Sequence, residues 1–202
     1  MSPLNHPDTP NIPSSSAILG IRSSTLINAP IQVVWDALTD TSTYPKWSRF
    51  VPLVTIREQP DSGNGDAILR NGTRFTFHVN MHPETEPQNQ NLRETFLKVI
   101  EIEPPASMKP GDRGLRRGRV VWASDSAADG YVMSSLLKVE RVHELEEMID
   151  GNGKRMTRVT NWESLVGALA YVVKWMFEGR LRRNIAVWEE GLKEYAERNL
   201  ED

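Results

Sequence analysis

The chain has 202 residues, of which 39% are hydrophobic and 25% are charged, and its formal net charge is −3. This length suits one globular core and is short for two. The near-balanced charge argues against broad attraction to nucleic acid, and the absence of cysteine excludes disulfides, thiolate metal sites and cysteine nucleophiles. We therefore expect a globular, cytoplasmic protein that binds no nucleic acid.

The N-terminal stretch MSPLNHPDTPNIPSSS contains four prolines and lacks the basic and apolar regions of a secretory signal. We expect residues 1–16 to form a disordered leader and residues 17–202 to form a single domain. No uninterrupted apolar run reaches the ~18–20 residues needed to cross a bilayer. The sequence therefore predicts no stable membrane insertion.

The first elements of the domain are a strand and two short helices. β-branched and apolar residues alternate loosely over residues 17–27, which predicts a strand. Asn28-Ala29-Pro30 then places a proline near the first turn of a helix, and apolar residues recur at helical spacing in PIQVVWDALTD. A short helical turn is expected over residues 43–47.

Six further strands follow, separated by turn-forming stretches such as PDSGNG, HPETEPQNQN and DGNG. The predicted strands cover residues 51–58, 69–81, 92–102, 116–124, 131–148 and 154–163. Short separators rich in Gly, Pro and Asn are typical of hairpins. We therefore expect an antiparallel meander.

Apolar residues recur with a period of ~3.6 from residue 164 to about residue 199, which predicts one long helix. Gly179 is the expected position of a bend or break, because glycine is a poor helix former. The first half is apolar over much of its circumference and the second half has a narrower stripe. This difference predicts a buried first half and a half-solvated second half.

Three stretches resemble the START-like (SRPBCC) superfamily. They are INAPIQVVWDALTDTSTYPKWSRFVP at residues 27–52, VIEIEPPASMKPG with the later RRGRVVWASDS, and VERVHELEEMIDGNGKRMTRVTNWESLVGALA at residues 139–170. The resemblance covers roughly residues 17–198. It implies an α+β helix-grip fold, in which a seven-stranded curved antiparallel sheet, two short helices and a long C-terminal helix enclose a cavity.

The resemblance leaves several functions open, because this superfamily includes polyketide cyclases, lipid and sterol carriers, quinone-binding proteins and co-chaperones. The first possibility is binding of a small, largely apolar ligand of the polyketide, lipid or quinone class. The second is a cofactor-independent cyclase, dehydratase or isomerase that acts in the same cavity. The third is a co-chaperone-like interaction module. We expect no cofactor in any of these cases.

Alternation along the strands and the helical stripe predict the apolar walls of the cavity. The same residues would serve equally well as ordinary core. The predicted ligand-binding residues are the polar Asn161 and the apolar Phe75, Phe77, Val79, Met81, Trp122, Val139, Leu145, Leu169, Val173, Met176 and Phe177. Trp162, Trp175 and Trp188 are further candidates for the cavity wall or for helix docking.

A polar corner is predicted where Arg141 and His143 interrupt an apolar row and face Asn161 and Glu163 across a hairpin. The hypothetical catalytic residues are Arg141, as a fork of donors, His143, as a group that moves a proton near neutral pH, and Glu163. The alternative is that the Arg-His pair only reaches Glu163 as a structural carboxylate. This alternative is favoured, because buried charges require partners.

Two other groups of side chains provide weaker evidence for a binding site. His78 and His82 would lie ~13 Å apart along a strand, which is too far for a shared metal ion, so no metal site is expected. Arg180, Arg182 and Arg183 lie beside the apolar helix face and could contact a membrane. Packing of an amphipathic helix on its own sheet explains them more simply.

Overall fold

The computed structural model describes residues 6–60, 65–84, 91–106, 115–128 and 135–200. Seven strands form one antiparallel sheet in the order β1-β7-β6-β5-β4-β3-β2. The strands are β1 (Leu19–Ile27), β2 (Leu53–Glu58), β3 (Arg74–Val79), β4 (Arg93–Glu103), β5 (Arg117–Ser124), β6 (Lys138–Ile149) and β7 (Arg155–Val166). The helices are α1 (Ile31–Thr39), the 3₁₀ helix η1 (Thr41–Thr43), α2 (Tyr44–Trp47) and α4 (Ala168–Arg198). The predicted helix-grip architecture is confirmed.

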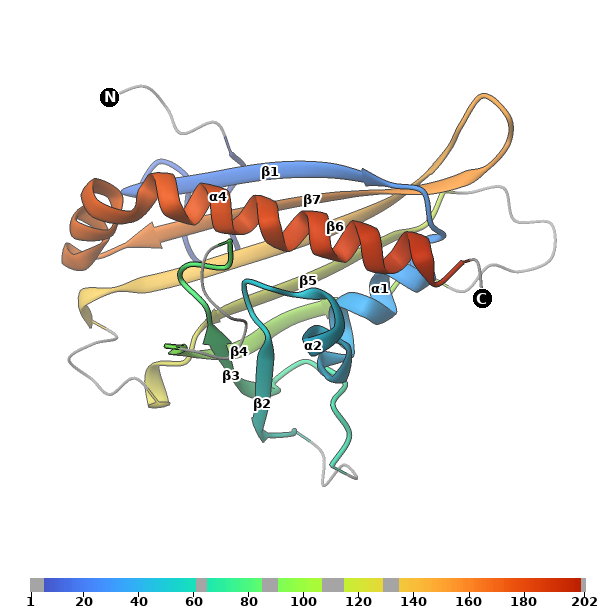
Figure 1. Ribbon diagram of the computed structural model, residues 1–202. Helices are drawn as coiled ribbons and strands as arrows, with labels where there is room; N and C mark the ends of the chain where they lie inside the picture. The colour runs from blue at the N-terminus through green and yellow to red at the C-terminus, as the bar shows by residue number, and fades with distance from the viewer. Residues whose placement is uncertain (1–5, 61–64, 85–90, 107–114, 129–134, 201–202) are drawn as a thin grey trace.

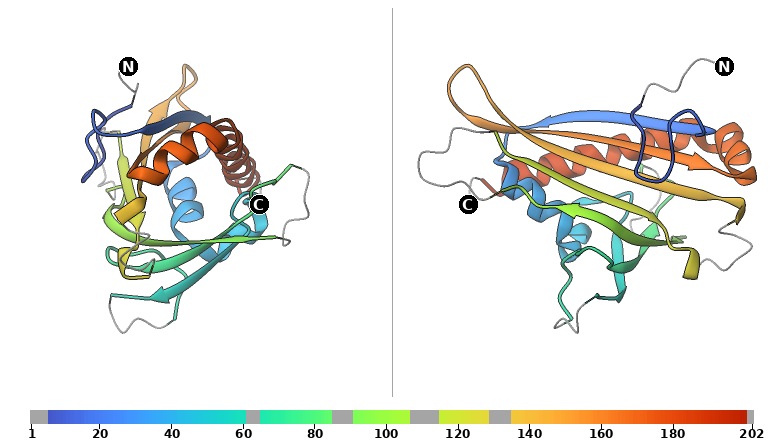
Figure 2. Two further views of the ribbon diagram at one scale, coloured as in Figure 1. Left: turned by 90° about the vertical axis from the view of Figure 1, so that its left-hand side faces the viewer. Right: turned by 180° about the vertical axis from the view of Figure 1, so that it is seen from behind.

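The sheet curves around the helices, as the two views in Figure 2 show. The long helix α4 runs along β1 and β7 on the inner face, and α1 and α2 lie below its C-terminal half (Figure 1). A cluster of aromatic rings joins these layers. Trp47 packs edge-on against Trp188 of α4, while Phe75 and Phe77 pack edge-on against Trp122 of β5.

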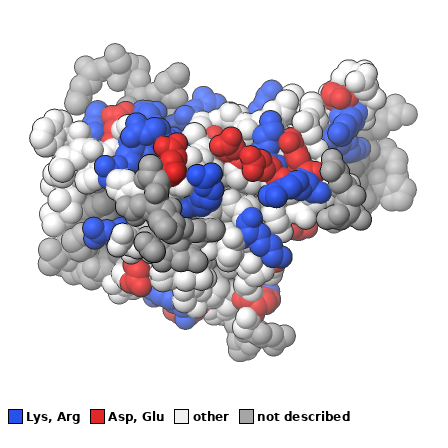
Figure 3. Space-filling model, in the orientation of Figure 1, with Lys and Arg blue, Asp and Glu red and all other residues white. Residues whose placement is uncertain are grey.

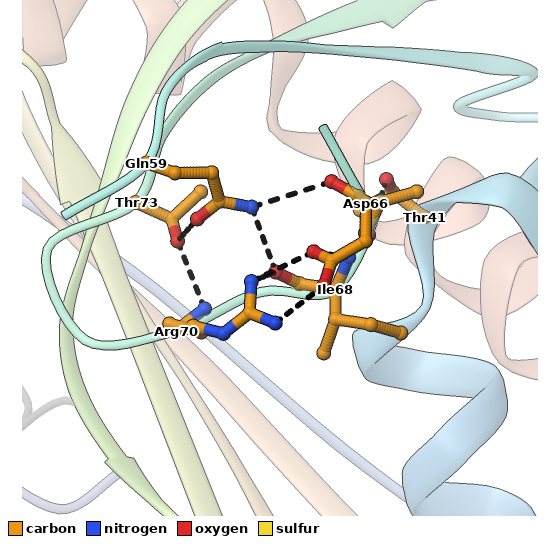
Figure 4. A network of polar contacts seen from close by, with 7 residues as sticks. Thr41, Gln59, Asp66, Ile68, Arg70 and Thr73 are labelled. Carbon is orange, nitrogen blue, oxygen red and sulfur yellow. Dashed lines mark hydrogen bonds and ion pairs between the residues drawn. The ribbon is translucent and has the colours of Figure 1, made fainter. Parts of the chain in front are cut away.

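The strand predicted over residues 69–81 is shorter in the structure, because a turn occupies its first residues. Gly72 adopts a φ of 92°, which favours glycine, and the Thr73 amide donates to the Arg70 carbonyl. An ion pair between Arg70 and Asp66 and a hydrogen bond from Thr73 to Gln59 hold this turn (Figure 4). Similarly, β6 begins at residue 138, and the predicted strand residues 131–134 lie outside the described residues.

The N-terminal segment 6–16, which was expected to be disordered, packs against the outer face of the sheet. The Asn11 amide and side chain both donate to the Glu140 carboxylate, at 3.0 and 2.7 Å. Trp162 Nε1 donates to the Asp8 carbonyl at 3.3 Å, and Ile12 is buried. The composition of residues 1–16 could not predict these contacts, because Glu140 and Trp162 lie more than 120 residues further along the chain.

The helix α4 is continuous through Gly179, so the helix does not break there. Its first turns nevertheless point in a different direction from its C-terminal half, as the left view of Figure 2 shows. A Cβ at Gly179 would meet only the tip of Arg183, whereas a Cβ at Gly191 would lie 2.3 Å from the Trp47 carbonyl oxygen. The predicted burial of the two halves was wrong. Trp175 and Met176 in the first half are exposed, whereas Trp188 and Leu192 in the second half are buried.

Candidate ligand cavity

A cavity of about 220 Å³ lies between the sheet and the first half of α4. Its walls come from the loop after α2, from strands β3 to β7 and from one face of α4. Apolar side chains dominate this lining. The lining residues are Phe50, Val51, Phe77, Val79, Met81, Thr95, Leu97, Trp122, Leu137, Val139, Arg141, Glu163, Leu165, Val173 and Leu181.

The structure brings together about half of the predicted ligand-binding residues. Those that line the cavity are Phe77, Val79, Met81, Trp122, Val139 and Val173. Phe75 and Leu145 are instead fully buried in the core, and Leu169 and Phe177 are partly buried without lining the cavity. Met176 is exposed on the outer face of α4. The periodicity identified the helix but did not define which part of its wide apolar surface faces inward.

Arg141 and Glu163 form the polar end of the cavity. They are directly paired across β6 and β7, and Arg141 Nη2 forms an ion pair with Glu163 Oε2. Both side chains are about nine-tenths buried. The Nε of Arg141 is also buried and has no hydrogen-bond acceptor among the described residues. Glu163 therefore balances the charge of Arg141, while one donor of Arg141, Nε, has no acceptor in the described part of the chain.

His143 lies behind the cavity rather than in its wall, between the rings of Trp122 and Trp188. It is fully buried, and neither ring nitrogen has a hydrogen-bond partner in the described part of the chain. Burial, assisted by the positive charge of Arg141, lowers the pKa of His143 well below its ordinary value of 6.5. The predicted proton transfer by His143 near neutral pH is therefore not supported, because the lowered pKa favours the neutral imidazole and the ring does not line the cavity.

Asn161, the remaining predicted polar residue, contacts α4 instead of the cavity. Its side-chain amide donates to Glu189, which also accepts a 2.7 Å hydrogen bond from Ser23. Burial raises the pKa of Glu189, while the two hydrogen bonds and the charge of Arg141 oppose this shift. These three side chains therefore link β1, β7 and α4.

The loop after β3 attaches to α4 near Met81, which lines the cavity. Asn184 Nδ2 donates to the Met81 carbonyl at 3.2 Å, and Arg49 donates to the Pro83 carbonyl at 3.0 Å. A weaker contact of 3.4 Å joins Arg180 to His82. Asn184 and Arg180 therefore hold this loop against α4, and Arg49 holds it against the segment after α2.

Sequence reasoning missed several lining residues. We assigned Phe50 and Val51 to the family signature at residues 27–52, without a role in the cavity. Leu165 and Leu181 were assigned to the predicted long helix, whereas the structure places Leu165 in β7. Thr95 and Leu97 alternate along β4 in the same way as the predicted residues of β3, so strand alternation could have identified them. The loop position of Phe50 carried no such signal.

The chain belongs to the family of polyketide cyclase/dehydrase and lipid transport proteins, whose family model matches residues 27–187. A curated relative is the oxopyrrolidines biosynthesis cluster protein O of Penicillium oxalicum. It is 38% identical over 194 residues, which cover 94% of this chain and 92% of the relative. The resemblance noted in the sequence is thereby confirmed.

Solved structures share the fold. A hypothetical protein from Helicobacter pylori has a TM-score of 0.63 at 18% identity, covering 97% of this chain and 99% of that chain. The Zhui aromatase/cyclase from Streptomyces sp. R1128 has a TM-score of 0.53 at 14% identity, covering 90% and 95%. At these identities the likeness shows the fold alone. Among the described residues, no helix is both long and apolar enough to cross a membrane.

Proposed function

We propose that the protein binds a small, largely apolar molecule in the cavity beneath α4 and holds its polar group with Arg141. The observation that carries this proposal is the buried Nε of Arg141, which has no acceptor among the described residues. A buried donor without an acceptor costs about 1–3 kcal/mol. A ligand with an acceptor oxygen at this point would remove that cost, while its apolar part contacts Phe77, Trp122 and Val173.

The cavity volume favours a compact ligand. At about 220 Å³ it lies below the roughly 300–1,000 Å³ of sites that hold drug-sized molecules. This size favours one ring or a short chain over a whole lipid, sterol or multi-ring polyketide. The name of the Penicillium oxalicum relative refers to oxopyrrolidines, which are five-membered lactams with a carbonyl oxygen. Such a ring matches both the volume and the free donor.

Two probes of similar shape test the proposal. Acetophenone carries one ring and one carbonyl oxygen, and ethylbenzene lacks the oxygen. We expect the wild-type protein to bind acetophenone and 1-methyl-2-pyrrolidinone, with at least a fivefold preference for acetophenone over ethylbenzene in NMR titrations. The double variant Arg141→Met/Glu163→Leu should lose this preference, because both probes then meet an apolar wall. Equal affinities in the wild type would contradict the role of Arg141.

Two adjacent positions on α4 provide a matched pair of variants. Val173 lines the cavity, whereas Val172, which lies about 100° away around the helix, is exposed. Val173→Trp should abolish binding of the probes by filling the cavity, and Val172→Trp should leave it unchanged. Retained binding in Val173→Trp would locate the probe elsewhere.

The pairing of a carboxylate with a cation also supports a second function, abstraction of a proton next to a carbonyl. Glu163 would take the proton from the α-carbon, and the electron pair of the C–H bond would form an enolate whose oxygen Arg141 stabilises. The proton then returns to the same carbon, or the enolate carbon attacks a second carbonyl, as a cyclase requires. No cofactor takes part in these steps.

Exchange of the methyl protons of acetophenone in D₂O distinguishes this enzyme from a binding protein. An enzyme should accelerate exchange above the buffer rate, and Glu163→Gln should remove the acceleration while circular dichroism confirms folding. Wild-type exchange at the buffer rate, together with probe binding, would exclude proton abstraction and leave the binding function.

A further inference from the structure

Four large apolar side chains are exposed on the outer face of α4, directly opposite the cavity. Trp175 is 86% exposed, Tyr171 58%, Met176 56% and Val172 44%. They are four of the ten exposed large hydrophobic side chains among the described residues and lie within six positions. The other three residues follow Tyr171 by one, four and five positions, which places all four on one side of the helix. We call these four residues the outer patch.

Basic residues adjoin the outer patch. Arg182 and Arg183 are exposed and lie about two helical turns after Trp175 along α4. Arg183 has no carboxylate within ion-pair distance in the described ranges, while Arg182 pairs with Glu178. Between residues 168 and 187, four basic and one acidic side chains give a formal charge of +3, whereas the whole chain carries −3.

The charge distribution is visible on the surface. In Figure 3, Lys and Arg side chains gather beside uncharged surface at the end of the molecule where α4 begins. Tryptophan and tyrosine with a basic margin are characteristic of helices that lie in the interface of an anionic membrane. Charge complementarity thus points to a negatively charged partner surface that also accepts apolar side chains.

We propose that the outer patch is a reversible docking surface for a bilayer rich in anionic phospholipid. Trp175 and Met176 enter the headgroup region, and Arg183 contacts lipid phosphates. The inner face of the same helical turns, at Val173 and Leu181, lines the cavity. Docking therefore places the cavity next to the phase in which apolar small molecules concentrate. This role goes beyond ligand binding and does not depend on the ligand's identity.

Vesicle sedimentation tests the proposal. The full chain should bind vesicles of phosphatidylcholine with 30% phosphatidylserine at least tenfold more tightly than pure phosphatidylcholine, and 0.5 M salt should weaken this binding. Trp175→Ser/Met176→Ser should reduce binding at least tenfold. Each basic residue near an anionic surface contributes roughly fivefold, and Glu178 already balances the charge of Arg182, so Arg183→Gln should reduce binding roughly fivefold.

A matched control is Ile149→Ser, which removes a side chain that is 53% exposed at the β6–β7 hairpin. It should bind vesicles like the wild type. Wild-type protein that ignores phosphatidylserine, or a Trp175→Ser/Met176→Ser variant that binds as well as the wild type, would overturn the proposal. Lipid-free dimers in size-exclusion chromatography that dissociate in this variant would also overturn it, by showing that a second copy covers the patch.

Discussion

The two halves of α4 perform different tasks with the same helical periodicity. The first half leaves a cavity on its inner side and exposes Trp175 and Met176 on its outer side. The second half approaches α2 so closely that only glycine fits at position 191, against the Trp47 carbonyl. Close packing fixes the helix at one end, which allows the other end to remain incompletely packed around a ligand. The first half is therefore the region available for binding, and the second half is the anchor.

The largest effect is expected from breaking the ion pair beneath the first half. Glu163→Leu leaves Arg141 buried without a counter-charge and should lower the free energy of unfolding by about 3–5 kcal/mol. Arg141→Met/Glu163→Leu should recover most of this loss, because an apolar pair replaces both charges. Urea unfolding measures both variants. A double variant as unstable as Glu163→Leu would show that the pair stabilises the fold by more than mutual neutralisation.

The anchor is tested by Gly191→Ala. The added Cβ would lie 2.3 Å from the Trp47 carbonyl oxygen, so α4 and α2 must separate. We expect a loss of about 1–3 kcal/mol in thermal or urea unfolding, typical of overpacking. A neutral result would mean that the second half of α4 adjusts freely and is not the anchor.

Acid should destabilise the region around His143, which packs against Trp188 of the anchor. Its pKa is lowered in the folded state, so the unfolded state binds the proton more tightly. The free energy of unfolding is therefore highest above pH 6.5 and falls below it, by at most about 1.4 kcal/mol per pH unit from this group. His143→Phe should remove this contribution and retain probe binding. Unfolding curves at pH 7.5 and 5.5 measure the difference, and an unchanged pH dependence would contradict the assignment.

The smallest effect is a gain. Gly179 has a helical conformation and open space around its Cβ position, so Gly179→Ala should stabilise the protein by about 0.5–1 kcal/mol. It is also the matched control for Gly191→Ala on the same helix. A loss of stability in Gly179→Ala would indicate that the helix must bend at this residue.

The sequence was sufficient to predict the elements and much of the cavity. Alternation placed Phe77 and Val79 in its wall, and the hairpin at Asp150 correctly brought Arg141 opposite Glu163. Burial could not be predicted for a helix that is apolar on several sides, so Met176 was assigned to the wrong face. Nor could alternation distinguish Arg141 at the cavity from His143 two residues later. That distinction depends on Trp188, which covers His143 from α4.

A crystal structure of the protein soaked with acetophenone would test the proposed ligand site. We expect the ring among Phe77, Trp122 and Val173, with its carbonyl oxygen within about 3.2 Å of Arg141 Nε. A ring bound outside the cavity, or one inside it with the oxygen directed away from Arg141, would show that Arg141 does not hold the polar group of the ligand.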